Sequence, residues 1–201
     1  MARVLTGQVN PTGKLAITFP QSEADLPHPV IPPLSRADIG QGSGAVNGPA
    51  HGQSQYAITY SEGSKVGYKW YEAEHKPVLF PFGFGLSYTT YAYDRLQIDE
   101  ARRTVSFSVK NTGTRAGVEI AQVYVALPAA AGESFHRLAG WSRVALQPGE
   151  AKVVTVAIHP DILPIYEEAK SGWRLLPGRY QVSVGPSSAV ASLNGDLRIA
   201  N

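Results

Sequence analysis

The sequence predicts a mainly β protein, a β-sandwich of about seven strands preceded by an irregular N-terminal extension. Three observations support this prediction. After residue 88, apolar and polar residues alternate in short segments, which is the period of a half-buried strand. Turn residues such as Asn, Gly and Pro separate these segments. No segment with a helical period interrupts them.

The expected strands follow one another closely. Val105, Phe107 and Val109 alternate with polar residues, and an Asn-Thr-Gly turn follows them. Residues 118–127 are apolar on both faces, as is typical of a central strand. The expected strands lie at 90–98, 104–113, 118–127, 137–146, 151–159, 172–188 and 193–200, and the sixth of these segments contains a Pro-Gly turn.

The N-terminal part of the chain does not follow this pattern. Residues 10–13 form an Asn-Pro-Thr-Gly turn, and residues 15–19 make one short apolar strand. A lone strand needs sheet neighbours, and because the next 60 or so residues offer no obvious one, we expect it to be orphaned. Residues 26–55 are rich in Pro, Gly, Ser and Gln, which indicates a long loop or linker.

The segment 78–93, VLFPFGFGLSYTTYAY, is too broken in its first half for a regular strand or helix. Its aromatic residues surround turn-forming Pro and Gly residues, which favours rings packed about a fixed turn over direct stacking on a sugar. Rings without partners would form an exposed apolar patch. The five aromatic residues are Phe80, Phe82, Phe84, Tyr88 and Tyr91.

Composition narrows the classes of function. The chain has 201 residues, of which 43% are apolar, and a net charge of +2, so it can bury a core and gives no reason to expect a nucleic-acid or membrane partner. It has no cysteine, which excludes disulfides and thiolate sites. No stretch approaches the roughly 20 apolar residues that span a bilayer, and the N-terminus does not look like a signal peptide.

Tyr68, Trp70 and Tyr71 form an aromatic run beside Lys69 and Glu72. Flat rings next to polar groups suit the faces of sugars, so these three are the candidate substrate-binding residues. The alternative is that they pack the segment against a domain. In an extended segment, alternation would place Tyr68 and Trp70 on one side and Tyr71 on the other.

Trp141 and Trp173 lie within expected strands, so we expect them in the core or packed at an edge.

No catalytic residue can be assigned. A serine-hydrolase triad stays open, for instance Ser43 or Ser54 with His51 or His75, although the Gly-x-Ser-x-Gly elbow is absent. The histidines are widely spaced, so we expect surface or loop positions and no metal site, and nothing indicates a cofactor. The five histidines are His28, His51, His75, His136 and His159.

Three motifs, in this order, resemble one family. They are VLTGQVNPTGKLAITFP at 4–20, YSEGSKVGYKWYEAEHKPVLFPFGFGLSYTTYAY at 60–93, and the span from VKNTGTRAGVEIAQVYV to RLAGWSRVALQPGEAKVVTVAI at 109–158. Together they are similar to the C-terminal third of family 3 glycoside hydrolases, the β-glucosidase and β-xylosidase group.

The resemblance implies three parts. Residues 1–25 correspond to the last strand of an α/β sandwich domain, residues 26–87 to a Pro/Gly-rich connector, and residues 88–201 to a fibronectin type III-like (immunoglobulin-like) β-sandwich. In that family an N-terminal (β/α)8 barrel carries the catalytic aspartate and the α/β domain usually supplies the acid/base. A barrel needs roughly 200 residues or more, so these residues do not include one.

The expected function is therefore that of a structural, accessory portion of a β-glycosidase whose whole protein removes terminal β-linked sugars. Retaining hydrolysis needs two carboxyl groups about 5–5.5 Å apart, and we expect Glu62, Glu72 and Glu74 to be solvated or capping residues instead. A free-standing carbohydrate- or protein-binding module and an isolated esterase-like hydrolase are the alternatives. Whether the chain by itself is an enzyme stays open.

The expected partners are the catalytic domains of the whole enzyme, an oligo- or polysaccharide, or a second copy bound through the N-terminal arm. The family resemblance suggests a periplasmic or secreted parent enzyme.

Overall fold

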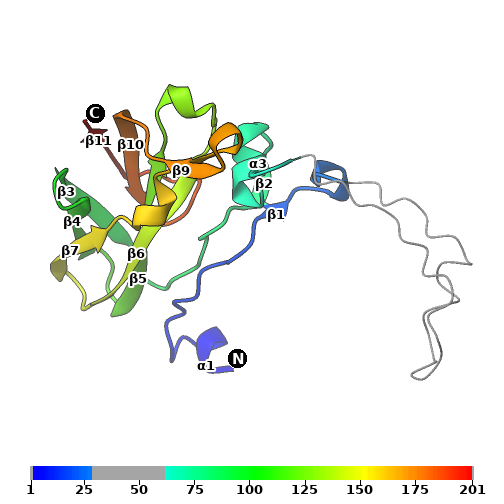
Figure 1. Cartoon of the computed structure of the whole chain (residues 1–201). Coiled ribbons are helices and arrows are strands. Elements are labelled where there is room, and N and C mark those ends of the chain that lie inside the picture. The colour runs from blue at the N-terminus through cyan, green and yellow to red at the C-terminus, as the bar shows by residue number, and fades with distance from the viewer. Residues whose placement is uncertain (1, 29–61, 201) are drawn as a thin grey trace, which may run out of the picture.

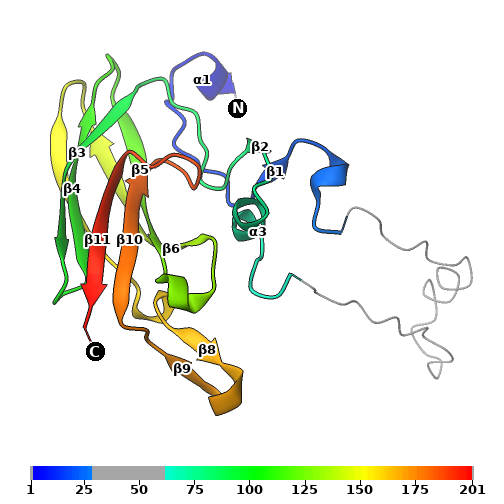
Figure 2. The ribbon, with the colours of Figure 1, turned by 90° about the horizontal axis from the view of Figure 1, so that it is seen from above.

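The computed structural model describes residues 2–28 and 62–200. Two antiparallel sheets face each other in a sandwich (Figure 1; seen from above in Figure 2). One has the order β11-β10-β5-β6, from Leu193–Ile199, Gly178–Gly185, Gly117–Ala126 and His136–Leu146. The other has the order β3-β4-β7, from Tyr91–Asp99, Thr104–Asn111 and Ala151–Ala157. The predicted seven-stranded sandwich is confirmed.

Alternation of side chains builds the core. In β4 the residues Val105, Phe107 and Val109 are almost fully buried between the sheets, whereas Ser106 on the other face bonds Thr155 of β7 at 2.8 Å. Strand β5 lies between β10 and β6 and is buried from Ala121 to Val125, as expected of a central strand. The sandwich therefore encloses a core drawn from both sheets.

A short hairpin, β8–β9, stands apart from the two main sheets. It pairs Ile165–Glu167 with Gly172–Arg174 and is joined by the 3-10 turn Glu168–Lys170. Strand β8 was not among the expected strands. The remaining 3-10 turns of the sandwich are Ala129–Ala131 and Pro160–Ile162.

In residues 2–28 and 62–87, the N-terminal extension contains short elements only. They are helix α1 (Ala2–Leu5), strand β1 (Phe19–Pro20), the 3-10 turn Glu23–Asp25, helix α3 (Tyr68–Ala73) and strand β2 (Val78–Phe80). The segment after α1 and the segment after β2 run side by side (Figure 1), and Leu15 exchanges backbone hydrogen bonds with Gly83 and Phe84, each at 2.8 Å.

The expectation of an orphaned strand at 15–19 is wrong. Phe19 pairs with Phe80, so β2 of the same chain supplies the missing neighbour. The partner escaped notice because β2 is only three residues long and runs directly into the irregular Pro-Phe-Gly turn. The rings of this segment pack on one another, with centroids 5.1 Å apart for Phe80 and Phe84, yet Phe80 and Tyr88 remain exposed, as anticipated for rings short of partners.

Two further expectations need correction. Residues 68–71 are helical, so strand alternation does not apply to them; six residues are too few for a helical period to show in the sequence. The expected packing of Trp141 and Trp173 is also wrong, because their side chains are 66% and 70% exposed. Trp141 lies on β6, which is an edge strand, and Trp173 lies on the separate hairpin.

Candidate functional site

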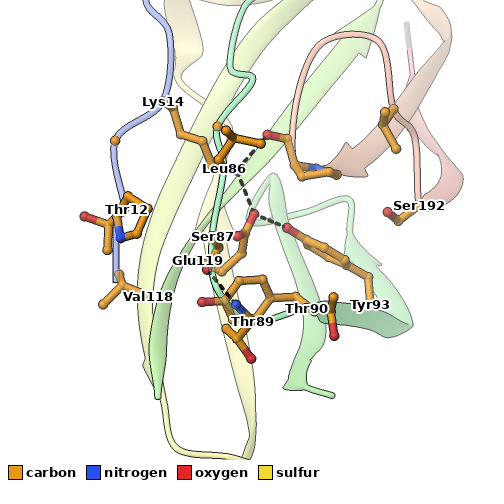
Figure 3. Close-up of a pocket in the computed structure, with 16 residues that line it drawn as sticks. Thr12, Lys14, Leu86, Ser87, Thr89, Thr90, Tyr93, Val118, Glu119 and Ser192 are labelled. Carbon is orange, nitrogen blue, oxygen red and sulfur yellow. Dashed lines mark hydrogen bonds and ion pairs between the residues drawn. The ribbon is translucent and has the colours of Figure 1, made fainter. Parts of the chain in front are cut away.

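A cavity of about 340 Å³ lies where the N-terminal extension meets the sandwich (Figure 3). Its polar centre is the carboxylate of Glu119 on β5, which accepts hydrogen bonds from Lys14 Nζ at 3.1 Å and from Tyr93 Oη at 2.9 Å. Lys14 Nζ also donates to the Pro186 carbonyl at 3.2 Å. We call Asn10, Lys14, Ser87, Tyr93 and Glu119 the polar joint, because they connect the extension, the connector and both sheets.

Glycines let these segments approach closely. Gly83 has φ +79°, and a Cβ there would overlap the side-chain amide of Gln122. That amide donates to the Gly83 carbonyl at 3.2 Å and to the Pro186 carbonyl at 2.7 Å. A Cβ at Gly85 would overlap the Gly13 carbonyl oxygen. Both glycines of the Phe-Pro-Phe-Gly-x-Gly string are therefore explained by close approach, of Gly83 to a side-chain amide and of Gly85 to a backbone carbonyl.

Two asparagines complete the connection. Asn10 accepts from Tyr88 N at 2.8 Å and from Ser87 Oγ at 3.0 Å, and it donates to the Ala116 carbonyl at 3.0 Å. Asn111, fully buried at the end of β4, accepts from Thr89 Oγ1 at 2.6 Å and donates to the Arg115 carbonyl at 2.7 Å. The Asn residues of the first and third motifs thus hold the second motif in place.

The electrostatics of the polar joint favour a structural role for its residues over a catalytic one. Glu119 is only 4% exposed, and a buried carboxylate needs a compensating partner, which Lys14 supplies. Burial, and then the Glu119 carboxylate beside it, raise the pKa of Tyr93 well above its usual range. A phenol that stays protonated and a carboxylate engaged by an ammonium group suit a fixed connection between segments.

The sequence did not lead us to predict the pairing of Lys14 with Glu119. A signal was present, because Glu119 interrupts an otherwise apolar central strand, and a buried acid calls for a basic partner. The sequence offers 18 Lys and Arg residues as partners, however, and nothing in it singles out Lys14.

The predicted aromatic run lies elsewhere, on α3. Tyr68 stacks on Phe82 with centroids 5.0 Å apart, and its hydroxyl oxygen accepts a hydrogen bond from Leu138 N at 2.8 Å. Burial raises its pKa to about 12. Tyr71 is buried, and Trp70 packs edge-on against it and stays partly exposed. Tyr68 and Tyr71 therefore hold the helix on the sandwich, and a sugar-binding role for this run would depend on Trp70.

Glu72 of the same helix pairs with His136, the first residue of β6. Their Oε1 and Nδ1 atoms are 2.5 Å apart, and the backbone N–H of His136 donates to Glu72 Oε2 at 3.2 Å. The His136 ring also meets Tyr124 edge-on with centroids 4.5 Å apart. The expectation that His136 is a surface or loop residue is wrong, because the connector covers this strand end.

The other two carboxylates considered in the sequence each form an ion pair with a different residue. Glu62 pairs with His28 at 2.9 Å, and Glu74 pairs with Lys65 at 2.9 Å. Ser43, Ser54 and His51 lie outside the described residues, so the triad hypothesis stays untested. Within residues 2–28 and 62–200, no three His, Cys, Asp or Glu side chains gather where they could hold a metal ion. In the same ranges no helix is long and apolar enough to cross a membrane.

Comparison with protein families gives two matches along the chain. Residues 1–88 match the glycosyl hydrolase family 3 C-terminal domain, and residues 119–188 match the fibronectin type III-like domain. The first match spans both the expected remnant strand and the connector.

Individual relatives agree with these matches. Probable β-glucosidase K of Emericella nidulans is 36% identical over 202 residues, and the thermostable β-glucosidase B of Acetivibrio thermocellus is 32% identical over 206 residues. Each alignment covers 99% of this chain but only 22% and 25% of the relative. Among solved structures, β-glucosidase 3B of Thermotoga neapolitana in complex with α-D-glucose superimposes with a TM-score of 0.81 at 32% identity, covering 100% of this chain and 26% of that one.

Proposed function

Because the chain belongs to glycoside hydrolase family 3, where it corresponds to the C-terminal region of the β-glucosidases, we propose that it acts as the docking portion of such an enzyme. The whole protein would hydrolyse terminal β-linked glucosides. The chain spans about a quarter or less of the length of the curated relatives named above. Its own part would be to hold the fibronectin-like sandwich against the catalytic domains.

The distribution of exposed apolar side chains supports this proposal most directly. Among the residues that the structure describes, ten of the fifteen exposed large hydrophobic residues lie before residue 89, in the extension and connector. Soluble proteins rarely leave such residues concentrated in one region unless something covers them. They are Leu5, Val9, Ile17, Phe19, Leu26, Val66, Leu79, Phe80, Leu86 and Tyr88.

The polar joint gives this surface a fixed relation to the sandwich. Asn10 and Lys14 carry the segment that includes Ile17 and Phe19, and Ser87 lies between exposed Leu86 and Tyr88. A partner that covers these apolar residues would therefore orient the whole sandwich. The carboxylates Glu62, Glu72 and Glu74 pair with three different basic residues, so they do not form the facing pair that retaining hydrolysis requires.

A chimera tests the proposal. In β-glucosidase 3B of Thermotoga neapolitana, the region that aligns with this chain is deleted in one variant and replaced by these 201 residues in another. We expect the deletion to abolish soluble, active enzyme and the replacement to restore hydrolysis of an aryl β-glucoside. A matched chimera with Phe19→Asp and Phe80→Asp should lose most of the restored activity. A deletion variant as active and as heat-stable as the intact enzyme would contradict the proposal.

A further inference from the structure

Hairpin β8–β9 presents two aromatic rings to solvent. Tyr166 and Trp173 are paired across the hairpin, with ring centroids 5.4 Å apart and planes inclined at 69°. Their side chains are 51% and 70% exposed. The hairpin projects from the sandwich at the end opposite helix α1 (Figures 1 and 2), away from the N-terminal segment that carries much of the proposed docking surface.

The core does not need these rings. All three residues of β9 lack buried side chains, and the hairpin is anchored from below by Leu163, which is fully buried just before β8. Cross-strand aromatic pairs do stabilise hairpins, but a pair buried on one side would serve that purpose without exposing most of an indole ring.

The charged residues of the hairpin are balanced in sign. Glu167 accepts from Lys170 Nζ at 3.1 Å and from Arg174 Nε at 2.6 Å, and the hydrogen bond from Lys170, followed by the charge of Arg174, lowers the pKa of Glu167. With Glu168, the hairpin carries two acids and two bases. The hairpin as a whole therefore has no formal net charge.

We propose that hairpin β8–β9 is a binding site for a neutral β-linked glucan chain. The faces of β-linked pyranose rings carry axial C–H groups, which pack on the electron-rich face of an aromatic ring. The indole of Trp173 supplies that platform, and Tyr166 packs against it with its ring plane inclined at 69°. This site is independent of the proposed docking function, because it needs neither the extension nor a catalytic domain.

The size of the platform favours a saccharide over a protein. A stable protein interface buries about 800 Å² on each partner, whereas two aromatic side chains supply at most about 500 Å². A few sugar units need no larger surface. The balanced charge also disfavours a nucleic acid, whose phosphates require a basic surface.

Affinity electrophoresis tests this site. The unchanged chain and its variants are run in native gels with and without soluble mixed-linkage β-glucan. We expect the glucan to retard the unchanged chain, and Trp173→Ala to weaken binding by about tenfold or more, the size of one lost ring stacking. Trp141→Ala is the matched control, because Trp141 is equally exposed on the sandwich edge, and it should be retarded like the unchanged chain.

A second measurement separates binding from folding. The chain has three tryptophans, so its NMR spectrum holds three indole N–H signals, which the Trp173→Phe and Trp141→Phe variants assign. Added cellotetraose should shift the Trp173 signal and leave the Trp141 signal in place. Absence of retardation, equal retardation of Trp173→Ala, or loss of binding on Trp70→Ala instead would overturn the proposal. None of these results depends on the chimera experiment.

Discussion

The sandwich and the N-terminal extension are built on opposite principles. The buried hydrophobic cluster lies wholly between Val105 and Leu197, whereas among the described residues before 88 the one buried hydrophobic side chain is Tyr71. The extension instead relies on hydrogen bonds to the sandwich, through Asn10, Lys14 and Gly83. One region can therefore stabilise itself, and the other takes its shape from surfaces around it.

Replacement of a core ring should produce the largest effect and test the first half of this comparison. Phe107 is 1% exposed between the sheets, so Phe107→Ala should lower the free energy of unfolding by about 3–5 kcal/mol. The matched change in the extension, Phe80→Ala, should cost less, about 1–2 kcal/mol, because Phe80 is 39% exposed and lies outside the core. Urea unfolding followed by circular dichroism measures both. Equal losses would show that the extension has a core of its own.

The buried ion pair of the polar joint comes next. Glu119→Leu leaves the Lys14 ammonium without its carboxylate, and loss of one partner of a buried pair costs about 3–5 kcal/mol. The double variant Glu119→Leu with Lys14→Met removes both charges and should recover most of that loss. Chemical unfolding of the two single variants and the double variant gives the coupling energy directly. Additive losses would mean that the two side chains do not depend on each other.

The same contrast explains what the sequence could predict. In strands such as 104–111, apolar and polar residues alternate over the full length of the strand, so the sequence alone predicts which face is buried. The hairpin β8–β9 and the β1–β2 pair have strands of two or three residues, too short for any period to show. Partners such as Lys14 with Glu119 and Glu72 with His136 are 105 and 64 residues apart, and only the fold brings them together.

Family resemblance located the three motifs but not their physical purpose. Asn10, Gly83 and Gly85 belong to quoted strings, and the structure shows that each serves a contact between distant segments. The candidate residues Tyr68, Trp70 and Tyr71 were chosen for their chemistry, yet burial decides how much of each ring is available. Sequence gives residue type at a position, whereas exposure depends on neighbours that sequence alone does not identify.

Gly83 and Gly149 have similar positive φ angles but different surroundings. Comparing them distinguishes the cost of backbone strain from the cost of a steric overlap. Gly83 and Gly149 have φ +79° and +76°, but a Cβ at Gly149 would meet open space, whereas one at Gly83 would overlap Gln122. Gly149→Ala should cost about 1 kcal/mol, from backbone strain alone. Gly83→Ala should cost about 1–3 kcal/mol more, since the Gln122 amide must also move. Differential scanning calorimetry of both variants checks this difference, and identical melting temperatures would show that the extension yields at that contact.

Substitutions of exposed rings in the extension should reduce self-association of the chain and lower its free energy of unfolding less than a core substitution does. The exposed rings of Phe19 and Phe80 pack edge-on with centroids 6.3 Å apart, and they form an apolar surface that a second copy could cover. We expect light scattering of the purified chain to show dimers or larger species at high concentration. Phe19→Ser with Phe80→Ser should shift the population to monomer, whereas Val153→Ser, an equally simple change at an exposed residue of the sandwich, should not. A chain that stays monomeric at all concentrations would mean that the exposed rings of the extension are reserved for a different partner.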